Sequence, residues 1–444
     1  MKDIINKIQG QSMKRFIQLS ILLIFCIPTL LLAQQPKVFT GGKIIPISGD
    51  PIDNGVLVIQ NGEIIAVGTQ GKVDIPSDAK TYDVSGKVIM PGLVDSHSHV
   101  GGGDGGDQSS ALHPDTRIMD SIDPRSDTFK KALAGGITTV NVMPGSGHLM
   151  SGQTVYLKLR KANKIEDMLL VEDPQEEVAG GLKMANGTNP IGKGPFPGTR
   201  AKSASMVREL FIKAQNYKGK VEKADGDPEK MPTRDIGMET LVDVLNGKRI
   251  VHHHTHRHDD ILTAIRLAEE FDYRLVLHHV SEAWKVADEI AEADIPASII
   301  VLDSPGGKME AVDIKYKNGA VLEDAGVTVG YHTDASITDT RLFLRSGAFG
   351  VRAGMSRKGA LKALTIENAK MLDAQNRVGT LEKGKDADFI ILSGDPLSVY
   401  TRVQQTWVEG KKRFDISNPK DRKYATGGYN VFERTTQNHN HGRK

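Results

Sequence analysis

Residues 87 to 99 read Lys87-Val-Ile-Met-Pro-Gly-Leu-Val-Asp-Ser-His-Ser-His99, an apolar run that ends in two histidines. Successive side chains of a strand point to opposite faces, so a strand over this run places His97 and His99 on the same face. The end of a buried strand would then present two imidazoles to one side, which is the arrangement of a metal site. The alternative is that both histidines make only ordinary structural hydrogen bonds. Patterns elsewhere in the chain distinguish the two interpretations.

The length and the charge of the chain indicate which class of protein to expect. A chain of 444 residues suits one large barrel of roughly 250 residues or more together with a smaller domain. The 57 Lys and Arg nearly balance the 55 Asp and Glu, so the charge indicates neither a nucleic acid partner nor electrostatic binding to a membrane. We therefore expect a soluble α/β protein.

The N-terminus has the pattern of a signal peptide. Lys14 and Arg15 precede an apolar stretch, residues 16–32, that ends at Ala33-Gln34. The stretch is short and contains Pro28, so an uncleaved membrane anchor is the weaker alternative. We exclude residues 1–33 from the fold and expect an exported protein, periplasmic or extracellular, that is free of the membrane after cleavage.

The single cysteine, Cys26, lies inside this segment. The mature chain therefore has no disulfide and no thiolate for zinc, so a metal ion must be held by His, Asp, Glu or Lys.

The two ends of the mature chain share a β pattern. Short apolar runs occupy residues 36–89, and Asn61-Gly62 between two of them is a strong hairpin signal. Residues 386–392 and 403–408 have the same character. We predict a small β-sandwich built from both chain ends, residues 34–89 and 385–430, with a larger domain at 90–384 and a disordered tail at 431–444.

The larger domain alternates between strand-like and helical patterns. Apolar runs at residues 138–142, 250–253, 274–278 and 327–331 are separated by segments such as 260–270, in which apolar residues recur at helical spacing. This alternation predicts βαβ units and a parallel sheet. The charged stretch 219–235 is expected to be a solvated connection. Polar residues at the carboxyl ends of such strands are typical of catalytic sites.

Histidine is concentrated at those strand ends. Of the 14 histidines, five lie between His252 and His258, and His278 and His279 end another apolar run. A fourth run leads into Asp334, and a buried carboxylate is rare unless it is paired or bound to a metal. Together these four strand ends favour a metal site.

These residues resemble the amidohydrolase superfamily of metal-dependent hydrolases, and within it the imidazolonepropionase-like branch. The resemblance covers nearly the whole mature chain. It implies a distorted (β/α)8 TIM barrel flanked by the small β-sandwich. The matching stretches are Met90–His99, Gly136–Thr139, Pro144–Gly147, Leu182–Ala185, His254–Arg257, Asp259–Ile261, His279–Glu282, Thr333-Asp334 and Gly379–Asp388.

The resemblance also implies the ligands. A first metal would bind His97, His99 and Asp334, and the next two strand ends would supply His254 and His279. In members with two metals, a lysine that carries a carbamate bridges them, and Lys183 is the candidate, with an ordinary surface lysine as the alternative. Two zinc ions fit nitrogen and oxygen ligands best, with manganese or iron as alternatives. The other nearby histidines, His256, His258, His278 and His332, are expected to shape the pocket or bond the backbone.

The implied reaction is hydrolysis of a small-molecule amide or another C–N bond, including small peptides, by a metal-bound hydroxide, with Asp334 as general base and acid. A mononuclear deaminase or imidazolone-type ring hydrolase is the nearest alternative. It usually has a glutamate where this chain has Arg257. A non-catalytic binding protein on the same fold is the second alternative.

Three charged side chains, Arg200, Arg257 and Glu282, are candidates for contacts with a charged substrate, and each could equally form a salt bridge. The sequence leaves the identity of the substrate open. It also leaves open whether the protein forms a homo-oligomer.

Overall fold

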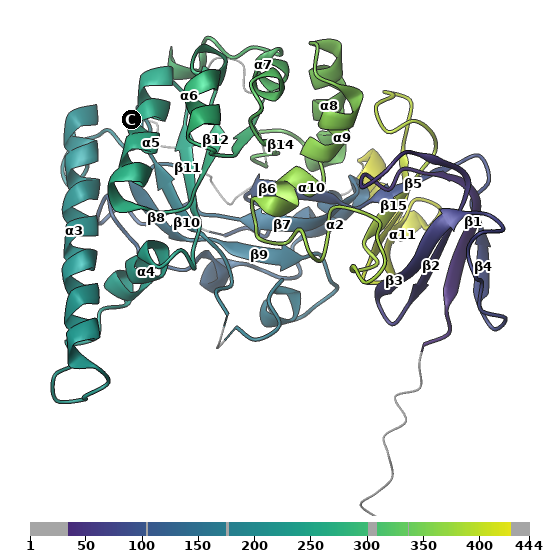
Figure 1. The fold of residues 1–444 in the computed structure, drawn as a ribbon, viewed down its shortest axis with the longest axis horizontal. Helices are drawn as coiled ribbons and strands as arrows, with labels where there is room; N and C mark the ends of the chain where they lie inside the picture. Colours follow the sequence, from purple (N-terminus) through teal and green to yellow (C-terminus); the bar gives the residue numbers. More distant parts are fainter. Residues whose placement is uncertain (1–33, 104, 175–176, 301–308, 336, 428–444) are drawn as a thin grey trace, which may run out of the picture. The chain divides into compact units, whose positions relative to one another are not determined.

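The computed structural model describes residues 34–103, 105–174, 177–300, 309–335 and 337–427 (Figure 1). The predicted signal peptide at 1–33 and the predicted tail at 431–444 lie outside the described residues. Among the residues that are described, no helix combines the length and the apolar character that a membrane crossing needs. The described residues from Pro36 onward belong to one unit, and the elements below lie within it.

An eight-stranded sheet combines strands from both ends of the described chain. Asn61 and Gly62 join two of its strands with φ angles of 52° and 93°, the conformation that a two-residue hairpin turn needs, so the predicted hairpin is confirmed. The strand order is β17 (Lys411–Asp415), β16 (Val403–Val408), β15 (Phe389–Leu392), β5 (Val88–Pro91), β1 (Lys37–Ile44), β2 (Ile52–Gln60) and β3 (Glu63–Thr69), with β4 (Lys80–Asp83) also paired to β1.

The predicted β-sandwich needs a correction, because these strands form one hydrogen-bonded sheet and not two. Two strands separate β1 from β16, so a flat sheet would hold them about 14 Å apart at the usual spacing of about 4.8 Å. Yet the rings of Phe39 on β1 and Trp407 on β16 lie edge to face with 5.2 Å between their centroids. The sheet therefore curls around an aromatic core that also contains Tyr82 and Phe389.

The rest of the chain forms two smaller sheets of mixed direction. One has the order β14 (Val329–Tyr331), β13 (Ala297–Ile299), β12 (Leu275–His279), β11 (Val251–Thr255), β10 (Leu182–Ala185) and β8 (Met150–Gln153). The other has the order β6 (Leu93–Ser98), β7 (Ile137–Val142) and β9 (Val155–Lys158). Neighbours from β10 to β14 pair in parallel, as predicted, whereas β8 and β9 are antiparallel to their partners.

The two smaller sheets adjoin at both sides. Thr154 alone separates β8 from β9 along the chain. On the other side, the Asp334 backbone N–H, just beyond β14, donates to the carbonyl oxygen of His97 on β6 at 2.9 Å. The described strands do not form one closed ladder of hydrogen bonds. The fold is therefore α/β with mixed sheets, and the ends of β6 and β14 lie side by side.

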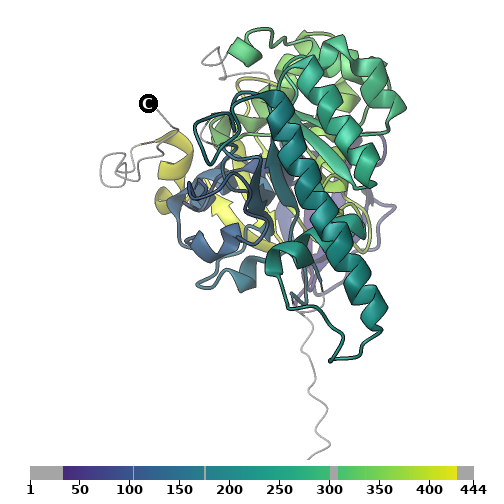
Figure 2. The same ribbon diagram turned by 90° about the vertical axis from the view of Figure 1, so that its left-hand side faces the viewer.

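Helices cover these sheets, and α3 and α5 pack on each other (Figures 1 and 2). Helix α3 begins after its cap Thr199 and continues to Ala224, so the solvated connection predicted from residue 219 is wrong for residues 219–224. Their Lys and Glu side chains lie along the last turns of the helix.

The helices are α2 (Asp127–Ala134), α3 (Arg200–Ala224), α4 (Ile236–Leu245), α5 (His258–Phe271), α6 (Ala287–Glu292), α7 (Asn318–Asp324), α8 (Phe343–Arg352), α9 (Arg357–Ala363), α10 (Ile366–Lys370) and α11 (Pro419–Thr426). Short 3-10 turns are η1 (Ile118–Ser121), η2 (Glu166–Met168), η3 (Ala283–Lys285), η4 (Met309–Ala311) and η5 (Thr340–Leu342).

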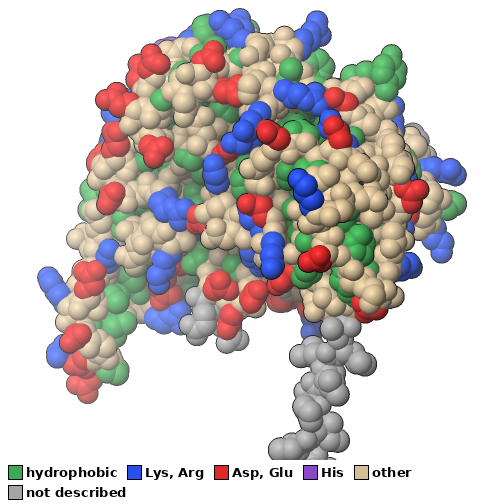
Figure 3. Space-filling model, turned by 45° about the vertical axis from the view of Figure 1, so that its right-hand side comes forward, with side chains coloured by type: hydrophobic (Ala, Val, Ile, Leu, Met, Phe, Trp, Pro, Cys, Tyr) green, Lys and Arg blue, Asp and Glu red, His purple; other side chains and the backbone are tan. Residues whose placement is uncertain are grey.

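Acidic and basic side chains are interspersed on the face drawn in Figure 3. The histidines at the strand ends lie inside: every residue of β11 is buried, including His252, His253 and His254. When other elements cover both faces of a strand, all of its side chains are buried. A site built from these histidines therefore lies in the interior of this part of the fold.

Candidate metal centre

Three side chains from β6, from the residue that follows it and from the turn after β14 form a first ligand group. His99 Nε2 lies 2.9 Å from Asp334 Oδ1, and His97 Nε2 lies 3.4 Å from the same oxygen. The ligand atoms of His97, His99 and Asp334 all lie within 4.8 Å of one another. These are the residues that the sequence assigned to the first metal, and the structure brings them together.

A second ligand group comes from the ends of β11 and β12. Its members are His254, His256 and His279, again with ligand atoms within 4.8 Å of one another. The rings of His254 and His279 are 4.2 Å apart, and His279 Nε2 lies 4.0 Å from Asp334 Oδ2. The two groups are therefore neighbours in one buried cluster.

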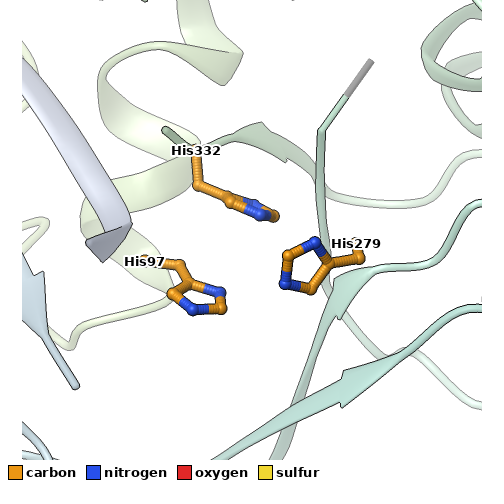
Figure 4. Close-up of side chains that lie close together, drawn as sticks. All are labelled: His97, His279 and His332. Atoms are coloured by element: carbon orange, nitrogen blue, oxygen red, sulfur yellow. The ribbon is translucent and has the colours of Figure 1, made fainter. Parts of the chain in front are cut away.

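A third ligand group joins the first two. It consists of His97, His279 and His332, whose rings face a common space (Figure 4). Sequence reasoning gave His256 and His332 no ligand role. A signal was present: His256 follows His254 by two residues and His332 precedes Asp334 by two, the spacing that keeps side chains on one face of an extended segment.

Lys183 on β10 lies inside this cluster and is not a surface lysine. Its side chain is completely buried, with Nζ 3.0 Å from His97 Nε2 and 3.0 Å from Met143 Sδ. Gly181, two residues earlier, allows this part of the chain to pack closely on β11, because a Cβ there would lie 2.4 Å from the ring of His252. The structure thus places the predicted bridging lysine beside the first ligand group.

Several imidazoles are held through Nδ1 so that Nε2 faces the cluster. The Nδ1 of His99 lies 2.7 Å from the carbonyl oxygen of Met143, which can only accept, so Nδ1 carries a proton and Nε2 faces Asp334. The Nδ1 atoms of His256 and His332 lie 2.7 Å and 2.9 Å from the hydroxyls of Ser281 and Ser298. A second hydrogen bond of this kind is typical of imidazoles that bind metals.

The charge states also suit a cation. Burial lowers the pKa of His97 and His279 well below the ordinary value, and it lowers that of His332 to about 3, so these rings are neutral at physiological pH. Burial alone would raise the pKa of Asp334, but the hydrogen bond and charge of His99 hold it below its ordinary value. The cluster therefore combines neutral imidazoles with an ionised carboxylate.

Unpartnered atoms test whether the residues fit a metal ion. In the described part of the chain, His279 Nε2 and His332 Nε2 are buried without a hydrogen-bond partner. Buried polar atoms are rarely left in this state, since each costs about 1–3 kcal/mol. A cation among these nitrogens would provide the missing partner, so the residues fit a metal ion.

Asp95 supports the site without joining a ligand group. It is completely buried and accepts hydrogen bonds from the backbone N–H and the hydroxyl of Thr333, at 3.0 Å and 2.5 Å. Thr333 precedes Asp334, so Asp95 orients the turn that carries the predicted general base.

The three predicted substrate contacts all lie in ion pairs. Arg257 forms a two-bond contact with Asp259, and Glu282 accepts from His258 and pairs with Lys285. Arg200 bonds Asp260 at 2.9 Å and lines a cavity of about 510 Å³ between α3 and α5. Glu282 belongs to none of the three ligand groups, and each of the three side chains is already engaged by a charged partner within the chain.

Comparisons with known proteins identify the family of the chain. Residues 315–419 match the family model described as "Amidohydrolase family". A solved amidohydrolase from Thermotoga maritima MSB8 is 32% identical, with a TM-score of 0.80, over 85% of this chain and 99% of that one. The amidohydrolase tasK of Hapsidospora irregularis is 25% identical over 81% of this chain, which spans only 40% of its length. An imidazolonepropionase from Rhizobium rhizogenes is 26% identical over 80% of this chain and 91% of its own.

The match to the Thermotoga protein covers nearly all of that chain and most of this one. The protein therefore belongs to the amidohydrolase family and is a hydrolase that acts on carbon–nitrogen bonds.

Proposed function

We propose that this protein uses divalent metal ions to hydrolyse an amide or another C–N bond of a small molecule, including small peptides and N-acyl amino acids. One observation carries the proposal: the ends of β6, β11, β12 and β14 converge on three overlapping groups of histidine and aspartate ligands. Such convergence is expected for catalysis and is not needed for folding.

The donor set supports two ions. His97, His99 and Asp334 would hold the first, and His254 and His279 the second. Lys183, 3.0 Å from His97, would bridge them as a carbamate, which provides anionic oxygens where an ammonium would repel cations. Zinc suits these nitrogen and oxygen donors, with manganese or iron as alternatives.

Bound divalent ions supply an activated water and polarise the substrate carbonyl. Residues of the chain would hold the proton of the attacking water and transfer it. Asp334 is ionised and oriented by His99 at 2.9 Å, so its carboxylate can take a proton from the attacking water and pass it to the leaving amine. His99 is itself fixed by Met143, which keeps the acceptor oxygen of Asp334 in one place.

We also propose the finer architecture. Strands β6, β7, the β9–β8 segment and β10 to β14 would form a distorted (β/α)8 barrel with one antiparallel strand. The Thr154 link and the hydrogen bond from Asp334 to His97 support this arrangement. Residues 90–384 would be the hydrolase domain, flanked by the sheet of residues 34–89 and 385–430.

Export through a signal peptide at residues 1–33 is a separate proposal. Peptide sequencing of the protein recovered from its native host tests it: a mature chain that starts near Gln34 supports export, and a chain that retains residues 1–33 contradicts cleavage.

The test of function combines metal analysis with a substrate screen. The purified protein is loaded with zinc or manganese, its metal content is counted, and N-acyl amino acids, dipeptides and lactams are assayed for release of amine. We expect two equivalents of metal, and hydrolysis that disappears after chelation and in His97→Ala. A folded protein that binds no metal would overturn the proposal, and one equivalent that is unchanged in Lys183→Ala would favour the mononuclear alternative.

A further inference from the structure

His332 is an imidazole of the cluster that has no role in the proposed reaction. His332 follows β14 directly and precedes Asp334 by two residues. Its side chain is completely buried, like that of His97. The ligand set implied by the family resemblance does not include it.

A chain of hydroxyl groups fixes one side of this ring. His332 Nδ1 lies 2.9 Å from Ser298 Oγ, which lies 2.7 Å from Ser96 Oγ, and both serines are completely buried. Nδ1 can therefore donate to Ser298 while Ser298 donates to Ser96. This arrangement leaves the lone pair of the ring on Nε2.

The other side of the ring faces the cluster. The His332 ring stacks on His97 with 4.9 Å between centroids and meets His279 edge to face at 4.7 Å (Figure 4). The ligand nitrogens of the three residues lie within 4.8 Å of one another. Two nitrogens on one tetrahedral zinc ion stand roughly 3.4 Å apart, given Zn–N bonds of about 2.1 Å, so small side-chain movements would close the group around an ion.

Packing alone does not account for this residue. His332 Nε2 is buried without a hydrogen-bond partner in the described structure, which costs about 1–3 kcal/mol that an apolar side chain would avoid. The same pattern, with Nδ1 on an oxygen and Nε2 toward the cluster, occurs in His99 of the first ligand group.

We propose that His332 Nε2 is an additional metal ligand, bound to the ion that His97 holds, and that Ser298 and Ser96 set its tautomer. The inference rests on the proposed function, since it takes the same ions. A group of neutral imidazoles favours zinc, iron(II) or nickel over magnesium or calcium. The barrel interior would thus contribute one nitrogen more than the ligand set that the resemblance implies.

Structure determination of the zinc-loaded full chain tests the proposal directly. We expect anomalous scattering to locate a zinc ion within about 2.3 Å of His332 Nε2, given the usual Zn–N bond. Zinc ions that all lie more than about 3 Å from that atom would overturn it.

Metal affinity provides an independent test with matched variants. His278 is a suitable control, because it is also completely buried, its Nε2 already lies 2.9 Å from His252 Nδ1, and it belongs to no ligand group. In zinc competition with a chelator, we expect His332→Asn to weaken one site by about 100-fold or more, Ser298→Ala by about 10- to 100-fold and His278→Asn by less than about fivefold. Equal affinities in the parent, His332→Asn and Ser298→Ala would refute the inference.

The outcomes separate this inference from the proposed function. A parent protein that binds no metal defeats both. A parent that binds two ions and hydrolyses amides, while His332→Asn keeps the same two affinities, defeats only the role of His332. If His332→Asn does not fold, as judged by circular dichroism, Ser298→Ala and the zinc-loaded structure decide.

Discussion

Lys183 Nζ lies 3.0 Å from His97 Nε2, and both side chains are completely buried. As an ammonium, Lys183 would donate to the nitrogen that the first metal needs. As a carbamate, it would present oxygens to both ions. The chemical state of this one lysine therefore decides how many ions the cluster can hold.

We expect Lys183→Ala to lose one equivalent of metal and to lower kcat by at least about 100-fold, because the bridging anion is gone. Metal content by mass spectrometry and steady-state kinetics measure the two effects. For the same reason, the metal-free parent should regain full activity with zinc only when bicarbonate is present.

Lys158 provides the matched control for Lys183. It is also completely buried, but it pairs with Asp386 at 2.7 Å and Asp388 at 2.6 Å, away from the ligand groups. Lys158→Met should lower stability and leave the metal content at two. Two equivalents of metal in Lys183→Ala would contradict the bridging role.

Asp334→Asn should lower kcat by about 100- to 10,000-fold, because an amide cannot take the proton of the attacking water. The acidic limb of the pH–rate profile should disappear with it. Rates measured across pH on the metal-loaded variant check both points. An unchanged pH profile would assign the general base to another group.

Much of this site follows from the sequence, because alternation along a strand is a local property. The spacing of His97 and His99 predicts two imidazoles on one face, and the structure places both beside Asp334. The spacing also separates His253 from His252 and His254, which the Cα alternation of β11 requires.

Other features depend on contacts between residues that are far apart in the sequence, and a local sequence pattern does not predict such contacts. His332 and His256 have the right spacing, but only the tertiary fold shows that they reach His279. The contact of Phe39 with Trp407 and the antiparallel direction of β8 and β9 depend in the same way on how distant strands meet. The sequence leaves Arg200, Arg257 and Glu282 open between substrate contact and salt bridge. The structure supplies the ion-pair partners Asp260, Asp259 and Lys285, and contact with a substrate stays a prediction.

Asp95→Asn should destabilise the fold by about 2–3 kcal/mol, because the buried carboxylate accepts two hydrogen bonds from Thr333 and an amide leaves one of these partners without a good acceptor. Urea unfolding followed by circular dichroism measures the change. Thr333→Ser keeps the hydroxyl and should change stability by less than about 1 kcal/mol. A loss below about 0.5 kcal/mol in Asp95→Asn would show that the turn before Asp334 is held by other contacts.

The last prediction concerns Asp339, beyond the turn that carries Asp334. Burial alone would raise the pKa of its carboxyl, but hydrogen bonds from Arg341 and Lys131 lower it to about 2. The folded pKa therefore lies below the ordinary value of about 3.9, so the carboxylate adds stability that is complete above about pH 5 and is lost as the pH falls through about 2. Asp339→Asn should thus reduce the free energy of unfolding by about 2 kcal/mol at pH 7 and by about half as much at pH 3. Urea titrations at the two pH values measure the difference. Asp53→Asn is the control, because its side chain is 85% exposed beside Lys43 and should change stability by less than about 0.5 kcal/mol at either pH. An equal loss at both pH values in Asp339→Asn would attribute the effect to packing, since only the ionised carboxylate can make it depend on pH.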